Sequence, residues 1–301
     1  MRVTRMQTLE EWFAGGERVP VTLPAAPDGS ARQYSIFRRV EGEGRWLTFL
    51  HGFPTCSWDW APVCDMLSSQ FRLLMPDFLG YGDSDKPRGH LYTVAEQADI
   101  VEALWRESGI AETGIVAHDF GDTVALELLA REREGRLSAR ITRVLMLNGG
   151  IYVTAARPLR IQRLLLKPGI GPALSLLLNE RMFSRSFASI FSPAHPISPV
   201  DLRQHWAAIR RRGGQRNYHR LIQYITERHR YCSRWEGALE ADAVPLRFLW
   251  GMVDPVSGSH VAAHLRQRLP QADIMELRDV GHYPQLEVPE IVAAHVIRTF
   301  A

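Results

Sequence analysis

Short apolar runs that end in Gly- or Asp-rich turns alternate along the chain with amphipathic helical patterns. This alternation is typical of an α/β sheet. Because the runs are apolar at nearly every position, we predict strands that are buried on both faces, as parallel sheets require. The predicted strands are WLTFLHG from Trp46, FRLLMPD from Phe71, GIVAHD from Gly114, ITRVLMLNGG from Ile141, PLRFLWG from Pro245 and ADIMELRD from Ala272. The predicted helices begin at Val94, Asp122, Ser259 and Glu290.

The strand pattern stops between residues 151 and 242, where the chain is rich in Arg and Leu and is interrupted by Pro and Gly. We therefore predict a helical insertion, residues 151–242, between two strands of one sheet. The core domain is then formed by residues 1–150 and 243–301.

No run reaches the roughly 18–20 consecutive apolar residues that a membrane span needs. The nearest candidate, residues 159–183, is broken by Arg163 and by the KPG sequence from Lys167. We interpret it as two amphipathic helices joined by a turn. The alternative is a lid surface that contacts lipid or a hydrophobic substrate.

Composition narrows the class of protein. With 46% hydrophobic residues the chain is expected to fold, and a net charge of +3 argues against a nucleic-acid partner. The N-terminus has no apolar segment typical of a signal peptide. The three cysteines form no CxxC pair, so we expect reduced thiols and a cytoplasmic location. Cys232 lies near His229 but lacks further zinc ligands, and we expect no metal and no cofactor.

The first candidate catalytic segment is AHDFGD from Ala117, between a predicted strand and a predicted helix. A nucleophile flanked by small residues at such a turn is the pattern of the nucleophile elbow. The central residue here is Asp119, where many such elbows carry Ser. An aspartate in this position is also a common helix cap, so the segment alone leaves both readings open.

Two more segments follow predicted strands and supply possible partners. Asp254 lies in GMVDP, and His282 lies in VGHYP. The chain order Asp119, Asp254, His282 matches the nucleophile–acid–base order of this type of sheet. The first interval leaves room for the helical insertion, and the second holds one helix and one strand. We therefore predict that the three side chains form a catalytic triad.

Oxyanion stabilisation requires two backbone donors near the nucleophile. The HGFP segment follows the strand from Trp46 and offers the N–H of Phe53. The residue after the nucleophile, Phe120, offers the second N–H. We predict that Phe53 and Phe120 form the oxyanion hole.

The segments HGFPTCSWDW, DFLGYGDSDKP, AHDFGD, DPV and GHYPQLE resemble the α/β-hydrolase superfamily, and within it the epoxide hydrolase and haloalkane dehalogenase branch. The resemblance implies an α/β-hydrolase fold whose insertion is a helical cap. It also implies an Asp nucleophile at Asp119, a base at His282 and an orienting acid at Asp254. Some relatives place the acid after the preceding strand, where this chain carries Asn148, which favours Asp254.

The treatment of the leaving group separates the possible reactions. An opening epoxide needs a proton donor, which cap tyrosines supply in epoxide hydrolases; the candidates are Tyr224, Tyr152 and Tyr218, with Tyr231 as a further one. A halide needs N–H donors, and dehalogenases usually carry Trp after the nucleophile, where this chain has Phe120. Epoxide hydrolases also commonly carry Trp there, so the match to that family is imperfect.

We expect an epoxide hydrolase that converts hydrophobic epoxides to diols through a covalent alkyl-enzyme ester. The alternatives are a haloalkane dehalogenase, a hydrolase that cleaves β-lactones or esters, or a non-catalytic protein of the same fold that binds a ligand. The expected partner is a hydrophobic small molecule, and the cap surface is a candidate for peripheral contact with a membrane. The substrate and the oligomeric state stay open.

Overall fold

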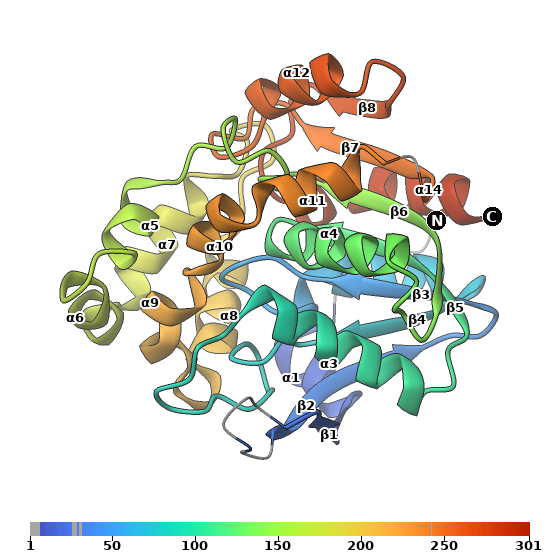
Figure 1. Cartoon of the computed structure of the whole chain (residues 1–301). Helices are drawn as coiled ribbons and strands as arrows, with labels where there is room; N and C mark the ends of the chain where they lie inside the picture. Colours follow the sequence, from blue (N-terminus) through green and yellow to red (C-terminus); the bar gives the residue numbers. More distant parts are fainter. Residues whose placement is uncertain (1–6, 26–28, 30–31, 242) are drawn as a thin grey trace.

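The computed structural model describes residues 7–25, 29, 32–241 and 243–301. Its centre is an eight-stranded sheet in the order β1-β2-β4-β3-β5-β6-β7-β8 (Figure 1). The strands from β4 to β8 are parallel, whereas β2 runs antiparallel to both β1 and β4. The strands are β1 (Glu17–Leu23), β2 (Arg32–Glu41), β3 (Arg45–Leu50), β4 (Phe71–Pro76), β5 (Glu112–His118), β6 (Arg140–Leu147), β7 (Leu246–Gly251) and β8 (Asp273–Leu277).

The six predicted strands correspond to β3 through β8, but the sequence pattern missed β1 and β2. Both lie at the sheet's antiparallel end, where one side of a strand can face solvent. In β1, Val19, Val21 and Leu23 are buried and alternate with exposed positions, and Pro20 is tolerated because this is an edge strand. The prediction that every strand is buried on both faces is wrong for β8, the other edge, which also alternates.

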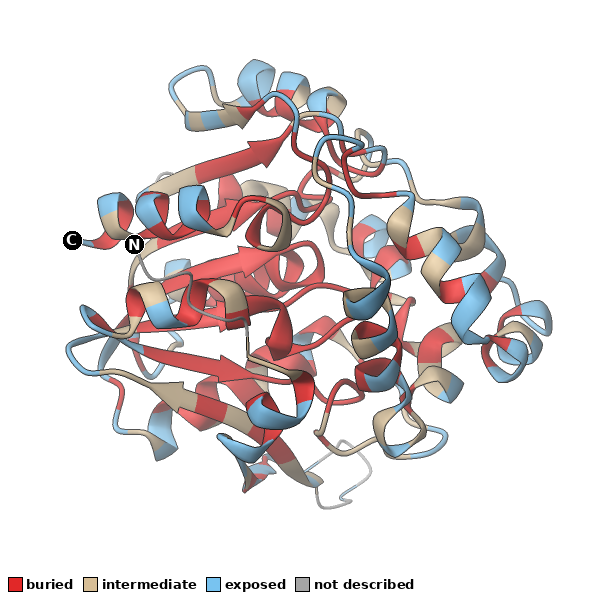
Figure 2. Cartoon of the chain, turned by 180° about the vertical axis from the view of Figure 1, so that it is seen from behind, coloured by how far each residue is buried: buried red, intermediate tan, exposed pale blue. Residues whose placement is uncertain are grey.

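Helices cover both faces of the sheet, and successive strand residues supply two separate cores. On β5, Ile115 and Ala117 join the core under α3 (Val94–Glu107) and α4 (Phe120–Arg133), while Val116 joins the opposite core. That opposite core lies under α2 (Ala61–Leu67) and α14 (Pro289–Phe300), which pack together (Figure 2). The remaining core helices are α1 (Leu9–Ala14), η1 (Ser57–Trp60), α12 (Ser259–Arg268) and α13 (Pro284–Glu287).

The chain between β6 and β7 is helical, as the loss of the strand pattern predicted. Its helices are α5 (Arg160–Leu165), α6 (Ile170–Leu177), α7 (Glu180–Ala188), α8 (Pro199–Arg210), η2 (Arg211–Asn217), α9 (Tyr218–Leu221), α10 (Tyr224–Arg230) and α11 (Cys232–Leu239). Helices α5 to α9 of this segment lie beside one end of the sheet, whereas α11 packs along α4 of the core (Figure 1). The predicted boundary at residue 242 lies outside the described residues. We refer to residues 151–241 as the helical insertion.

The apolar stretch 159–183 forms α5, α6 and the start of α7, separated at the predicted turn. Gly169 in that turn has φ 76°, a conformation that costs glycine nothing. Within the described chain, no helix has both the length and the apolar character needed to cross a membrane.

Candidate active site

Asp119 lies on a strained turn between β5 and α4, at the carboxyl edge of the sheet. Its backbone has φ 48° and ψ −102°, which few residues other than glycine adopt. The predicted small residue after it is sterically required, because a Cβ on Gly121 would lie 2.2 Å from the carbonyl oxygen of Leu50. The turn therefore raises the Asp119 side chain above the sheet instead of using it as a helix cap, since it makes no capping hydrogen bond.

The two carboxylate oxygens of Asp119 have different surroundings. Oδ2 accepts a hydrogen bond of 3.1 Å from the backbone N–H of Phe53, one of the two expected oxyanion donors. Phe120 begins α4, so its N–H has no acceptor inside the helix. Oδ1 accepts no hydrogen bond from the described residues and lies 3.7 Å from Nη2 of Arg228. Oδ2 thus occupies the expected donor site, and Oδ1 is the oxygen available for attack.

His282 and Asp254 form a tight buried pair, with 2.7 Å between Nδ1 of His282 and Oδ2 of Asp254. Since the carboxylate can only accept, Nδ1 carries the proton and Nε2 can receive one. Burial acts to lower the pKa of His282, but the charge and hydrogen bond of Asp254, with the charge of Asp119, raise it above its ordinary value. Burial acts to raise the pKa of Asp254, yet His282 and further hydrogen bonds hold it below its ordinary value. A histidine and a carboxylate in this geometry can serve as a general base and the acid that orients it.

Asn148, which stands where some relatives place the acid, supports Asp254 in this chain. Its Nδ2 donates to Oδ2 of Asp254 at 3.0 Å, and its Oδ1 accepts from the backbone N–H of Gly251 at 2.7 Å. Ser257 donates to the same Oδ2 through its backbone N–H, and Val256 donates to Oδ1. The carboxylate is thereby held in one orientation toward His282.

Glu287 joins the loop that carries His282 to the helical insertion. Its Oε2 accepts from the backbone N–H groups of Gly281 at 2.8 Å and of Ser192 at 3.0 Å. The backbone N–H of His282 donates to the carbonyl oxygen of Ile190 at 2.9 Å. These hydrogen bonds therefore connect the core to the helical insertion directly beside His282.

The three candidate tyrosines lie in different places. Tyr152 donates to Glu240 at 3.1 Å, away from Asp119, and Tyr218 donates to the carbonyl oxygen of Pro54 at 3.3 Å. Tyr224 is fully buried, and its hydroxyl makes no hydrogen bond to any described residue. Burial and the charge of Asp119 raise its pKa.

Tyr81 is a further candidate in the structure. It lies in the DFLGYGDSDKP segment but was not among the donors predicted from the sequence. Its ring stacks on Phe120, with centroids 5.8 Å apart, and its buried hydroxyl has no partner among the described residues. Burial raises the pKa of Tyr81, and the nearby Tyr224 and Asp119 add to the shift. Two unpartnered phenols thus lie close to the candidate nucleophile.

Arg228 is the second residue that the sequence reasoning missed, because an arginine in a basic helix normally faces solvent. Here it is buried, and it donates to Thr123 at 2.7 Å and to the carbonyl oxygen of Asp119 at 3.0 Å. Its guanidinium lies 4.7 Å from the ring centroid of Tyr224. A Cβ on Gly150 would lie 2.5 Å from Nη1, so that glycine leaves room for the arginine. The cation sits where it favours negative charge on Asp119.

An apolar pocket of about 60 Å³ lies between the core and the insertion. Ligand sites for drug-sized molecules are usually about 300–1,000 Å³. A larger substrate can therefore bind only if the helices of the insertion move and enlarge the pocket. The pocket is lined by Phe53, Pro54, Leu159, Ile161, Gln162, Leu165, Leu178, Phe183, Ser186, Phe187, Ile190, Tyr218, Val256 and His282.

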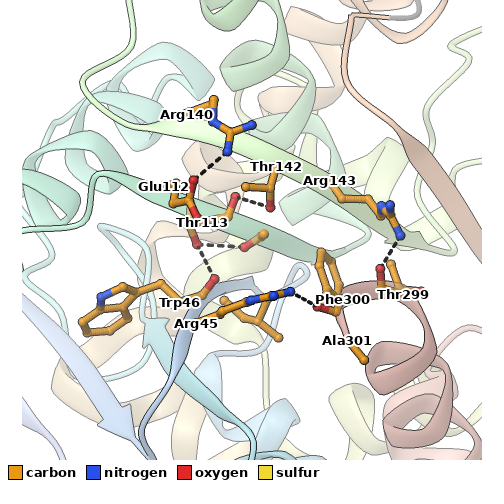
Figure 3. A pocket seen from close by; sticks show the side chains of 12 residues that line it. Arg45, Trp46, Glu112, Thr113, Arg140, Thr142, Arg143, Thr299, Phe300 and Ala301 are labelled. Atoms are coloured by element: carbon orange, nitrogen blue, oxygen red, sulfur yellow. Dashed lines mark hydrogen bonds and ion pairs between the residues drawn. The ribbon is translucent and has the colours of Figure 1, made fainter.

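A second cavity, of about 450 Å³, lies at the opposite edge of the sheet, where β3, β5 and β6 begin (Figure 3). Its cations are already engaged: Arg45 and Arg143 donate to the last carbonyl groups of α14, and Arg140 pairs with Glu112. These contacts stabilise the C-terminal end of a helix. No cluster of acidic, His and Cys side chains among the described residues is arranged to hold a metal ion.

The chain belongs to the α/β-hydrolase fold family, which it matches over residues 45–289. It is 37% identical over 286 residues to a putative hydrolase of Mycobacterium tuberculosis, LipZ, covering 95% of this chain and 96% of that protein. It is 42% identical over 258 residues to the human mesoderm-specific transcript homolog protein, covering 83% and 77%. A haloalkane dehalogenase from Bradyrhizobium elkani superposes with a TM-score of 0.74 at 22% identity, covering 93% and 96%.

Proposed function

We propose that the protein is an epoxide hydrolase that acts through a covalent ester on Asp119. One observation supports this choice over other reactions of an Asp nucleophile. The hydroxyl groups of Tyr81 and Tyr224 are beside Asp119 and lack partners in the described chain. The hydroxyl of Tyr81 is also fully buried, and keeping a polar atom buried without a partner costs about 1–3 kcal/mol, so such groups are often kept for function.

In the first step, Oδ1 of Asp119 attacks one epoxide carbon, and the bond from that carbon to the ring oxygen breaks. The ring oxygen takes a proton from Tyr224, with Tyr81 as the second donor. Arg228, over the ring of Tyr224, stabilises the resulting phenolate. The product of this step is an alkyl ester of Asp119 that carries a hydroxyl group on the adjacent carbon.

In the second step, Nε2 of His282 takes a proton from water, and the hydroxide attacks the carbonyl carbon of the ester. The oxyanion is held by the backbone N–H groups of Phe53 and Phe120. Collapse releases the second oxygen of the diol, which takes the proton from His282, and leaves Asp119 as a carboxylic acid that holds the second proton of the water. That proton passes to the phenolate, which restores both the carboxylate of Asp119 and the phenol, so the sum is epoxide plus water to diol.

The other reactions fit the site less well. Phe53 and Phe120 provide no side-chain N–H for a departing halide. Cleavage of a β-lactone or an ester does not need the phenols, and a binding protein would not need a base with its orienting acid. We propose that the helical insertion acts as the cap over a core formed by residues 1–150 and 243–301. The apolar pocket beneath it suits a hydrophobic epoxide.

The test is a single turnover in water labelled with heavy oxygen, with enzyme in excess over a hydrophobic epoxide such as styrene oxide. If Asp119 attacks directly, the first diol is almost unlabelled, and mass spectrometry finds the label in the peptide that contains Asp119. If Asp119 only activates water, the label appears in the first diol and the peptide stays light, which would overturn the proposal. Asp119→Asn is the control and is expected to be inactive.

A further inference from the structure

The outer surface of the helical insertion carries an unusual concentration of apolar side chains. Ten large hydrophobic residues of the described chain are exposed, and five of them lie on α5, α6 and α7. Leu176 and Leu177 are the most exposed of all, at 68% and 72%. The five are Leu164, Ile170, Leu176, Leu177 and Met182. We call the surface formed by these side chains and the cations among them the outer face of α5–α7.

Cations surround these apolar residues, and almost no acidic residue does. Between residues 159 and 189 the chain has five Arg or Lys side chains and one carboxylate, Glu180. All five cations are exposed, and none forms an ion pair within the described part of the chain. They are Arg160, Arg163, Lys167, Arg181 and Arg185. Elsewhere on this protein exposed arginines are commonly paired, as Arg140 is with Glu112.

The same helices separate the solvent from the apolar pocket beside His282. An open groove runs on the outside between α5 and α7, and Met182 and Arg185 contribute to it. Leu159, Ile161 and Ser186 line both this groove and the pocket. A single layer of side chains therefore divides the pocket from the groove.

We propose that the outer face of α5–α7 binds the surface of an anionic lipid bilayer and that substrate dissolved in the bilayer enters through the groove. Exposed leucines on a helix with flanking cations form the amphipathic surface that inserts at the lipid interface. The unpaired cations supply charge complementarity to anionic headgroups, worth roughly a fivefold gain in affinity for each. Such a position would deliver a hydrophobic molecule to the pocket without crossing water. This substrate route rests on the proposed function; the membrane binding does not.

The test measures sedimentation of the full chain with vesicles of phosphatidylcholine alone and with about one-third phosphatidylserine added. The protein should bind the mixed vesicles and be released by salt, because screening weakens surface charge attraction. Leu176→Asp/Leu177→Asp should abolish binding, and Arg163→Gln/Lys167→Gln should weaken it roughly 25-fold. Ile291→Asp, at an exposed position of α14 outside the helical insertion, is the matched control and should bind like the wild type.

Several results would overturn the proposal. They are absence of binding, equal binding to both kinds of vesicle, or a loss in Ile291→Asp equal to that in the Leu176 and Leu177 variant. A dimer in light scattering that the Leu176 and Leu177 variant dissociates would identify the surface as a contact between two copies instead. Turnover of a small water-soluble epoxide is a second measurement. The variant with Leu176→Asp and Leu177→Asp should hydrolyse this epoxide at the wild-type rate. Because sedimentation involves no chemistry, its failure leaves the proposed reaction untouched.

Discussion

Removing the two unpartnered hydroxyl groups should change stability and rate in opposite directions. In Tyr81→Phe the change deletes a buried oxygen with no acceptor or donor among the described residues. That oxygen costs the folded state about 1–3 kcal/mol, so the variant should be more stable by about 1 kcal/mol, a rise in Tm of roughly 2 °C. Tyr224→Phe should likewise not be destabilised, since its hydroxyl makes no bond to the described protein.

The expected change in the rate of ester formation is larger than the change in stability. Loss of a positioned proton donor slows the step it serves by roughly 10²–10⁴-fold, or about 3 to 5 kcal/mol of transition-state stabilisation. The assay mixes excess enzyme with epoxide, quenches at intervals and measures the ester on Asp119 by mass. Tyr224→Phe should show the full loss in ester formation, while hydrolysis of ester already formed stays near the wild-type rate. Tyr81→Phe should show a smaller loss in the rate of ester formation. The loss in the double variant should be smaller than the product of the two single losses, because both hydroxyls serve the same proton transfer.

Two tyrosines of the same chain serve as controls. Tyr152→Phe and Tyr218→Phe each remove a hydroxyl that donates to the protein, to Glu240 and to Pro54 respectively. Each should lose about 0.5–1.5 kcal/mol of stability, and Tyr152→Phe, whose side chain does not line the pocket, should leave ester formation unchanged. The reasoning fails if the double variant of Tyr81 and Tyr224 forms the ester at the wild-type rate, or if both lose stability as the controls do.

Two further expectations concern the base. His282→Gln should still allow attack by Asp119 but stop hydrolysis, so the protein should gain the mass of one substrate; continued multiple turnover would show that another group activates water. Ester hydrolysis should rise with pH, because His282 accepts a proton only when neutral and the charges of Asp254 and Asp119 raise its pKa. Esterification neutralises Asp119, so the midpoint for hydrolysis should lie below the pKa of His282 found by NMR in the free enzyme. A midpoint above that value would contradict this coupling.

The sequence predicted the fold best where burial is continuous. The parallel strands β3 to β7 have long buried runs that end in the turns bearing Asp119 and Asp254, so pattern and chemistry coincided. Neither β1 nor β2 has such a run: the edge strand β1 alternates between buried and exposed positions, and β2 has only three buried residues among ten, so both were missed. Each residue of the predicted triad follows a strand in the sequence. This position predicted that the three side chains lie together, because the carboxyl ends of parallel strands meet at one edge of a sheet.

The side chains from the insertion were harder to predict, because short helices do not reveal from sequence which face turns inward. Tyr224 and Arg228 are one turn apart on α10, and both are buried. Nothing in their spacing distinguishes them from neighbouring exposed residues of the same basic helix. The bonding partners of Tyr152 and Tyr218 come from distant segments and appear only in three dimensions.

The link between Glu287 and Ser192 has a consequence for how this scaffold could be redesigned. Since the backbone N–H of His282 donates to the carbonyl oxygen of Ile190, any graft that replaces the chain around residues 190–192 would also displace the proposed base. Helices α5 to α7 carry no such bond to the triad, and several of their pocket residues are apolar. Libraries aimed at new substrates should therefore vary α5 to α7 and keep the segment from Ile190 to Ser192 unchanged, which separates the residues that select a molecule from those that convert it.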